Sequence, residues 1–289
     1  MSNVAPAHVT GTPVVSDPVV PTAKPPAKSP LRIVAPIVVL GLVIALWYII
    51  SYGFMNANRR RVALPPPHTV WSDGVANTAS LHKAWNALMV TGRIALIGLI
   101  ISAVLGVLIA VAMNAAKWAE WAIYPYAVIV QVTPILALVP IIKIWFGPGE
   151  SSRILVVILI AIFPIITNTL FGLQSTERAH QDLFTLHQAS WWTRLWKLQL
   201  PSSLPAMFTG LRIAAGASVI GAIVGDFFFQ QGSRGIGLLI FNLQKDVRQA
   251  ELIVAALLSS LFGIVIFVVF SVVGNRILRS WHESARTDT

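Results

Sequence analysis

The chain has 289 residues, of which 56% are hydrophobic and 11% are charged, and its formal net charge is +10. Soluble domains carry about 25% charged residues, so this composition excludes an ordinary water-soluble domain. The sequence contains no cysteine, which excludes a disulfide framework, a thiolate metal site and a thiol nucleophile. Nucleic acid is not an expected partner, because the basic residues lie between apolar segments, where anionic lipid headgroups account for them.

The first 30 residues contain seven prolines and are expected to form a disordered tail in the cytoplasm. A cleaved signal peptide is the competing interpretation of this end. The apolar run that begins at Ile33 is too long for the apolar core of a signal peptide, and no small-residue cleavage site follows it. Residues 31–53 are therefore predicted to form a retained first transmembrane helix.

Long apolar runs recur along the chain, and about 20 helical residues cross a hydrocarbon core ~30 Å thick. Five runs carry no charge: Ile33–Ile50, Ile94–Ala116, Trp121–Ile142, Ile154–Thr176 and Leu252–Asn275. A sixth, Met207–Phe229, carries Arg212 and Asp226 near its ends and still counts as a span, because ionisable residues near helix ends reach the interface. The sequence thus predicts an all-α polytopic membrane protein with about six transmembrane helices.

Polar segments between these runs complete the predicted organisation. Residues 54–90 are expected to be an extracytoplasmic loop with a short lead-in helix, followed by a core of five transmembrane helices in residues 91–275. A long polar loop lies within this core at residues 174–203, and residues 276–289 form a C-terminal tail. Of the 21 lysines and arginines, about half would lie on each side of the membrane, so their distribution does not orient the chain.

Small residues repeat every four positions in two predicted spans. They are Ser102, Gly106 and Ala110 in one span, and Gly210, Ala214, Ser218 and Ala222 in the other. Such stripes let helix backbones approach closely in lipid, where van der Waals contact drives association. Packing within one subunit and packing against a second membrane subunit both remain open.

The polar loop at residues 174–203 has the pattern of two short helices, at about 176–188 and 191–199. Ser190 is placed to cap the second helix, because its hydroxyl can accept a hydrogen bond from a free backbone amide. Leu200-Pro201 is expected to end that helix, since proline lacks the amide donor and crowds the preceding turn. An amphipathic helix lying on the membrane surface is the alternative interpretation.

This loop resembles the cytoplasmic coupling loop of ABC importer permeases, whose pattern is Glu-Ala-Ala, three residues, Gly, nine residues and Ile-x-Leu-Pro. Aligned on Leu200-Pro201, Asp182 stands at the Glu position and Gln188 at the Gly position, while both alanines are replaced. Further segments resemble the nitrate/sulfonate/taurine branch of these permeases: Leu64–Trp71, Pro134–Glu150, Gln188–Ala214 and Gly235–Gly237. The resemblance covers most of the chain and implies the type I ABC importer permease fold.

The resemblance also implies partners and a cellular location. A second permease subunit, expected to be another copy of this chain, would complete the solute path, and an extracytoplasmic binding protein would deliver the solute. A separate ATPase dimer would bind ATP and Mg, since this sequence has no Gly-x-x-x-x-Gly-Lys-Ser/Thr loop. The chain itself is then neither an enzyme nor a cofactor or metal binder. It would lie in the plasma membrane with both termini in the cytoplasm, and its solute would be nitrate-, sulfonate- or taurine-like or a vitamin precursor.

Three groups of site residues follow from this resemblance and from the polar groups inside the spans. ATPase contact is expected from Asp182, Leu186, Gln188, Ala189, Ser190, Arg194, Leu200 and Pro201. Transmission of movement to the path is expected from Gly210 and Arg212. Path-lining candidates are Gln131, Thr133, Asn168, Ser218 and Asp226, because polar groups in hydrocarbon need protein or water beside them. Each could instead bond a neighbouring helix, and Asp226 could pair with Arg234 or Lys245.

A secondary transporter that is not coupled to ATP is the main alternative function. Such a protein is expected to show an inverted repeat and buried titratable groups for ion coupling. The sequence shows no convincing repeat, and acidic residues are nearly absent from the interiors of the spans. A channel and a membrane enzyme fit less well, because neither a glycine-rich filter nor a cluster of His, Asp and Glu is evident.

Overall fold

The computed structural model describes residues 31–278, so the expected tails at residues 1–30 and 279–289 lie outside the described residues. The chain divides into two units at Leu46, within helix α1 (Leu31–Gly53). In the first unit, every side chain from residue 34 to residue 46 is exposed. This exposure of apolar side chains suits a helix that is surrounded by lipid.

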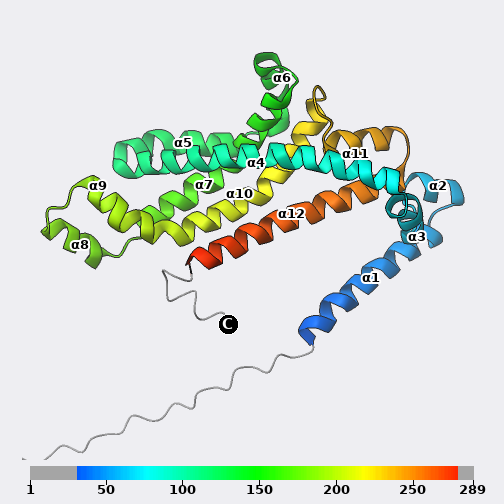
Figure 1. Cartoon of the computed structure of the whole chain (residues 1–289), viewed down its shortest axis with the longest axis horizontal. Helices are drawn as coiled ribbons and strands as arrows, with labels where there is room; N and C mark the ends of the chain where they lie inside the picture. The colour runs from blue at the N-terminus through cyan, green and yellow to red at the C-terminus, as the bar shows by residue number, and fades with distance from the viewer. Residues whose placement is uncertain (1–30, 279–289) are drawn as a thin grey trace, which may run out of the picture. The chain divides into compact units, whose positions relative to one another are not determined.

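All regular secondary structure in the described part of the second unit is helical (Figure 1). Its helices are α2 (Ala57–Val62), α3 (Pro67–Thr69), η1 (Val70–Val75), α4 (Thr78–Ala115), α5 (Lys117–Val132), α6 (Ile135–Phe146), α7 (Glu150–Gln174), α8 (Arg178–Leu186), α9 (Trp191–Arg194), η2 (Leu195–Gln199), α10 (Leu200–Phe228), α11 (Ile236–Lys245) and α12 (Gln249–Leu278). Five helical stretches of the described chain are long and apolar enough to cross a membrane, and the bent pair α5–α6 makes a sixth candidate.

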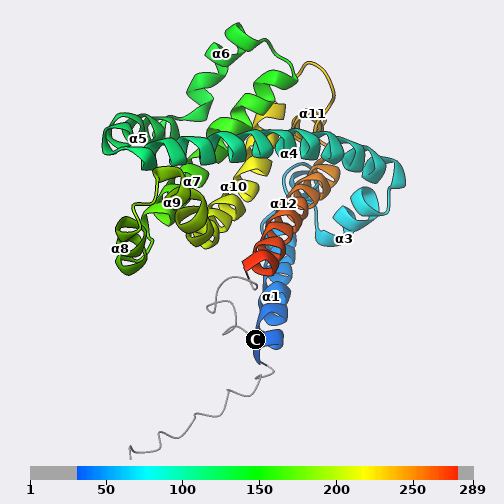
Figure 2. The same cartoon turned by 60° about the vertical axis from the view of Figure 1, so that its left-hand side comes forward.

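Helix α7 packs between α4 and α10 and forms the centre of the second unit (Figures 1 and 2). The small-residue stripes of α4 and α10 both face it. A Cβ atom added at Gly106 of α4 would lie 2.8 Å from Ile165, and one added at Gly210 of α10 would lie 2.7 Å from the carbonyl oxygen of Pro164. The two stripes therefore serve packing within one subunit, which resolves the alternative left open by the sequence.

The predicted third span, Trp121–Ile142, is not one straight helix. Helices α5 and α6 meet at an angle of 101° around Thr133 and Pro134. Pro134 has no amide to donate to the preceding turn and disfavours a helical conformation at Thr133, whose backbone is extended. The predicted third span is therefore a bent pair of helices, because this proline, one of three that mark kinks or breaks in the sequence, ends one helix and precedes the next.

Helix α4 begins earlier than predicted and includes the segment that was expected to form a separate lead-in helix. The Asn77 side chain caps it by accepting a hydrogen bond from the Ser80 amide, at 3.2 Å. No proline or glycine interrupts residues 78–91, so the helix runs without a break into the apolar span. The lead-in segment and the span are therefore one helix of 38 residues, which crosses the predicted boundary at residue 90.

Candidate coupling site

The loop between α7 and α10 begins with helix α8, whose end has a defined hydrogen-bonding pattern. The amide of Gln188 donates to the carbonyl of Thr185 at 2.9 Å, and the amide of Ala189 donates to that of Phe184 at 3.0 Å. This pair of bonds is the Schellman pattern, which requires a left-handed residue just past the helix. Gln188 supplies it with φ of 48°. It stands where the resembling family pattern has glycine, so the backbone geometry typical of glycine is present although the residue is not.

The second short helix begins directly after this turn. The Ser190 hydroxyl accepts a hydrogen bond from the Thr193 amide at 3.3 Å, which confirms the predicted N-cap. Trp191 and Trp192 follow with their rings 4.9 Å apart in an edge-to-face arrangement. The turn and the cap together fix the direction in which the chain leaves α8 and enters α9.

Pro201 does not end the second helix, contrary to the prediction. Helices α9, η2 and α10 form one continuous stretch, Trp191–Phe228, of 38 residues. The segment Leu195–Gln199 is π-helical, and the Leu200 amide donates to the carbonyl of Leu195. A π turn holds one extra residue and widens the helix directly before Pro201, so the proline is accommodated without ending the helix. The exposed loop is therefore continuous with a membrane-spanning helix.

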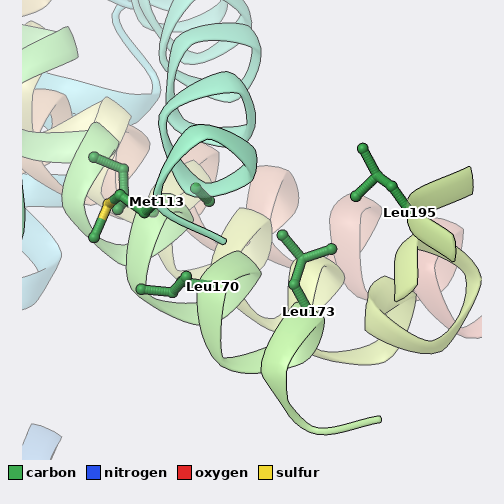
Figure 3. Packing of buried hydrophobic residues seen from close by; sticks show 6 residues of the cluster. Met113, Leu170, Leu173 and Leu195 are labelled. Carbon is green, nitrogen blue, oxygen red and sulfur yellow. The ribbon is translucent and has the colours of Figure 1, made fainter. Parts of the chain in front are cut away.

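One face of this helix is anchored in the core beside α4 and α7. Leu195 is 1% exposed and belongs to a cluster with Met113, Leu170 and Leu173 (Figure 3). Trp196, the next residue around the helix, points away from this cluster and is 64% exposed. The helix is thus held by apolar contact on one face while its indole rings remain free for a partner or for lipid headgroups.

Two polar contacts hold the loop to its own helices and to α4. The Arg194 guanidinium donates through Nη2 to the Thr185 hydroxyl at 3.1 Å, which ties α9 to α8. The Asn114 amide donates to the Gln199 side chain at 2.9 Å, which ties η2 to the end of α4. Arg194, expected to contact an ATPase, therefore has a partner within the chain.

The structure brings most of the predicted ATPase-contact residues onto one exposed segment. Asp182, Leu186, Gln188 and Ser190 are exposed, and Ala189 between them is half-buried. Leu200 and Pro201 are half-buried in the continuous helix beyond this segment. Gly210 is buried against the carbonyl of Pro164 and the side chain of Asn168, and Arg212 is half-buried.

The path-lining candidates are not brought together within one chain. Gln131 and Thr133 lie at the bend between α5 and α6, and the Thr133 hydroxyl donates to its own helix. On α7, the Asn168 amide donates to the carbonyl of Pro164 at 2.8 Å. Ser218 is 1% exposed and donates to the carbonyl of Ala215 in its own helix. The positions of Asn168 and Ser218 are those of helix-packing residues.

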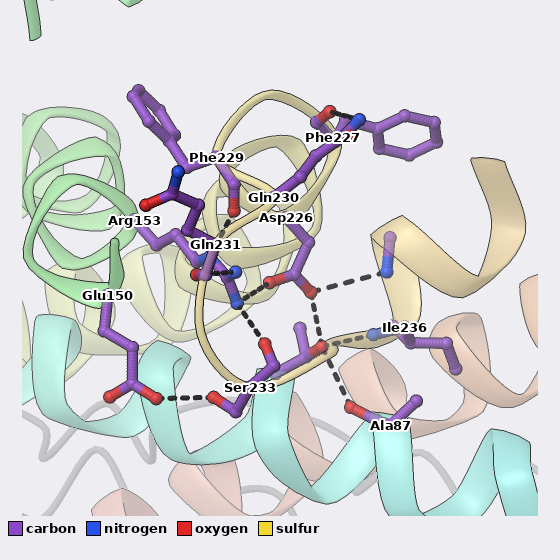
Figure 4. A network of polar contacts seen from close by, with 12 residues as sticks. Ala87, Glu150, Arg153, Asp226, Phe227, Phe229, Gln230, Gln231, Ser233 and Ile236 are labelled. Atoms are coloured by element: carbon purple, nitrogen blue, oxygen red, sulfur yellow. Dashed lines mark hydrogen bonds and ion pairs between the residues drawn. The ribbon is translucent and has the colours of Figure 1, made fainter. Parts of the chain in front are cut away.

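Asp226, the fifth path candidate, lies in a buried polar network at the end of α10 opposite the coupling loop (Figure 4). Its Oδ1 atom is 3.2 Å from Nη1 of Arg153 on α7, and both side chains are fully buried. The predicted pairing of Asp226 with Arg234 or Lys245 is therefore wrong. Its Oδ2 atom accepts from the Thr91 hydroxyl at 2.6 Å and from the Gly237 amide at 3.3 Å.

Arg153 also holds the connection between α10 and α11. Its guanidinium donates to the backbone carbonyls of Phe229, Gln231 and Ser233, each at 2.7 Å (Figure 4). Gly235 lies so close to the Asp226 carboxylate that a Cβ atom there would overlap it. The sequence analysis did not single out Arg153, although a charge that directly precedes an apolar run is visible in the sequence. That this charge pairs with Asp226 follows only from the packing of α7 against α10.

Comparisons with known proteins fit this architecture. The family model described as "Binding-protein-dependent transport system inner membrane component" matches residues 98–282. The formylaminopyrimidine transport permease protein ThiX of Halalkalibacterium halodurans is 36% identical over 222 residues, which are 76% of this chain and 86% of that protein. The putative aliphatic sulfonates transport permease protein SsuC of Escherichia coli is 28% identical over 239 residues, which cover 82% and 88% of the two chains.

A solved structure with low sequence identity to this chain supports the fold. The crystal structure of an amino acid ABC transporter with histidines matches with a TM-score of 0.55 at 12% identity, covering 71% of this chain and 97% of that one. The family match spans more than half of the present chain and includes α7, the coupling loop and α10. The chain therefore belongs to the family of binding-protein-dependent transport system inner membrane components, the membrane-spanning permeases of ABC transporters.

Proposed function

We propose that this chain is the permease subunit of an ATP-driven importer and that the α8–α9 loop couples it to a separate ATPase. The observation that carries this proposal is the continuity of the helix from Trp191 to Phe228. A displacement applied to the exposed loop moves α10 as a rigid element, because no break separates the two. At ~1.5 Å per residue, the helix reaches about 57 Å from the loop to its far end.

The contacts around this helix define how movement would spread. The Gln188 turn, the Ser190 cap and the Arg194–Thr185 bond hold the loop to the start of the helix. Along its length, the small-residue stripe of α10 packs on α7. At its far end, Asp226 is bonded to Arg153 of α7. The two helices are thus joined along their lengths, and a push on the loop would shift α7 and α10 together.

The assembly that we propose has two permease subunits, two ATPase subunits and an extracytoplasmic binding protein. ATP and Mg belong to the ATPase, and the second permease subunit is another copy of this chain. The coupling loop lies in the cytoplasm, which also places both termini there and the Arg153–Asp226 network toward the outer side. The membrane is the plasma membrane.

The proposed solute class follows from the names of the relatives. Their printed names refer to formylaminopyrimidine, riboflavin, aliphatic sulfonates, bicarbonate and nitrate. We propose that this permease carries a small solute of this range, either a vitamin precursor or a small anion.

The test is a coupling measurement on the assembled transporter in lipid vesicles. Ala189→Glu places a charge within the proposed contact and is expected to abolish ATP-dependent uptake of formylaminopyrimidine, riboflavin, taurine or nitrate, whichever the unaltered transporter carries. The matched control is Gln244→Glu, which introduces the same charge at an exposed residue of α11 and should leave uptake unchanged. Uptake that proceeds without any ATPase subunit would instead establish the secondary-transporter alternative.

A further inference from the structure

Arg212 was expected near the end of a span, but α10 begins seven residues before the predicted run, at Leu200, and Arg212 lies inside its membrane-spanning part. It is 12 residues from Leu200 and 16 from Phe228, or about 18 Å and about 24 Å along the helix axis. Helix α10 is about 43 Å long and the hydrocarbon core is ~30 Å thick. At most about 13 Å of the helix can therefore lie outside the core at either end. The backbone of Arg212 therefore lies at least about 5 Å inside the hydrocarbon core, wherever the core is placed along α10.

The guanidinium of Arg212 has little to stabilise it within the chain. Its Cζ atom lies 5.8 Å from the ring centroid of Phe267 on α12, and its buried Nε atom has no hydrogen-bond partner. Among residues 31–278, no ion pair involves Arg212. Phe267 is 11 residues, or about 16 Å, from the last residue of α12, so the guanidinium is also well away from the inner end of that helix.

A second copy of the chain would bring no compensating acid to this depth. The apolar runs that form the spans contain no Asp or Glu, apart from Asp226 at the far end of α10. Asp226 is already paired with Arg153 and fully buried. A charged side chain inside the bilayer requires water, an opposite charge or a polar cavity, so Arg212 needs a source of stabilisation from outside the protein.

The position of Arg212 on the helix shows where that source can lie. One side of α10 is buried against α7, and Arg212 borders the opposite, open side. Thr209 and Ile213 are exposed there, and a Cβ atom added at Gly216 would meet nothing within 4 Å. These positions recur at helical spacing and form one face, which we call the open face of α10: Thr209, Ile213, Gly216 and Ile220.

We propose that the open face of α10 lines the water-filled solute path and that Arg212 provides a positive site within it for an anionic group of the solute. This inference rests on the proposed permease function and adds a solute chemistry to it. A planar guanidinium binds sulfonate, carboxylate or phosphate oxygens through paired donors, and it keeps its charge in a cavity of low polarity. With two copies in the assembly, two such arginines would border the path.

The natural absence of cysteine makes a direct test possible. Single variants Thr209→Cys and Gly216→Cys would be prepared in the assembled transporter in lipid. Each would be treated with an anionic and with a cationic methanethiosulfonate reagent, and modification of this chain would be followed by intact mass. Rates would be normalised to those of free 2-mercaptoethanol. Ser102→Cys is the control, because Ser102 is fully buried between α4 and α7.

The expected result is that both open-face cysteines react, that the control does not, and that the normalised rate for the anionic reagent exceeds that for the cationic one by roughly tenfold. Adding Arg212→Gln should remove the preference, and Arg212→Lys should retain most of it. Unreactive open-face cysteines, or a preference that does not depend on Arg212, would overturn the inference. ATP-dependent uptake is measured on the same samples, so that failure of this inference can be told apart from failure of the proposed permease function.

Discussion

Arg153 and Asp226 form an ion pair between α7 and α10 in which neither side chain is exposed. Every oxygen and nitrogen that the pair buries has a partner: the remaining donors of Arg153 reach the loop after α10, and the second oxygen of Asp226 reaches Thr91 and Gly237 (Figure 4). Removing one member leaves an uncompensated buried charge, which is more costly than removing both.

Asp226→Leu is therefore expected to destabilise the chain by about 3–5 kcal/mol. The double variant Arg153→Met with Asp226→Leu should recover part of this loss, because no lone charge remains. Thermal unfolding of the purified permease in detergent measures both effects. Arg153→Met alone completes the cycle: if the loss of stability in the double variant equalled the sum of the losses in Asp226→Leu and Arg153→Met, the two side chains would not be coupled as described.

Gln188→Gly is expected to stabilise the end of α8 by about 1 kcal/mol, because glycine adopts a positive φ without the strain that a side chain imposes. Gln188→Val should have the opposite effect, since β-branched residues tolerate this conformation least. Hydrogen exchange of the amides at Gln188 and Ala189 reports on this turn directly.

The control is His187→Gly, one residue earlier, where φ is −81°. No strain is released there, and glycine only weakens the helix end, so protection should fall. Equal gains from both glycine variants would show that the left-handed geometry of Gln188 is not the cause.

Leu195→Ala is expected to cost about 2–5 kcal/mol, because it opens a cavity in the cluster with Met113, Leu170 and Leu173 (Figure 3). Leu186→Ala removes the same side chain from a site that is 81% exposed and should leave the unfolding temperature unchanged. The two variants separate the packing of the helix in the core from the proposed contact of the loop with the ATPase. Leu195→Ala should lower stability, while Leu186→Ala should lower ATPase stimulation in the assembled transporter.

Much of this architecture could be read from the sequence, because apolar runs, the Ser190 cap and the small-residue stripes are local patterns. Pro134, Pro140 and Pro164 mark kinks or breaks in the sequence, but which of them ends a helix could not be read from it. Pro125, Pro140 and Pro164 also lie in predicted spans, and the helices that contain them continue past them. Whether a proline ends a helix depends on what satisfies the freed carbonyl and how the neighbours pack, which are tertiary properties.

The site residues were predicted only in part, because tertiary packing also decides which side chains meet. The residues predicted to contact an ATPase lie near one another in the sequence, and Asp182, Leu186, Gln188 and Ser190 share one exposed segment. Asp226 was singled out, but its partner was sought among nearby residues, whereas Arg153 lies 73 positions earlier. Pairing of two helix ends is decided by which spans are neighbours, and one sequence without the packing of α7 against α10 does not reveal that.

The packing of α10 on α7 gives a matched pair of glycine variants within one helix. A Cβ atom at Gly210 would lie 2.7 Å from the Pro164 carbonyl oxygen, a backbone atom that cannot move aside without shifting α7. Gly210→Ala should therefore lower stability by about 1–3 kcal/mol through overpacking. At Gly216 a Cβ atom meets nothing within 4 Å, so Gly216→Ala should be neutral or stabilise the helix by up to about 1 kcal/mol.

Thermal unfolding in detergent compares the stabilities of the two variants, and ATP-dependent uptake shows whether separating α10 from α7 also weakens transmission of movement to the path. A harmless Gly210→Ala would mean that the close approach of the two helices is not needed in either role.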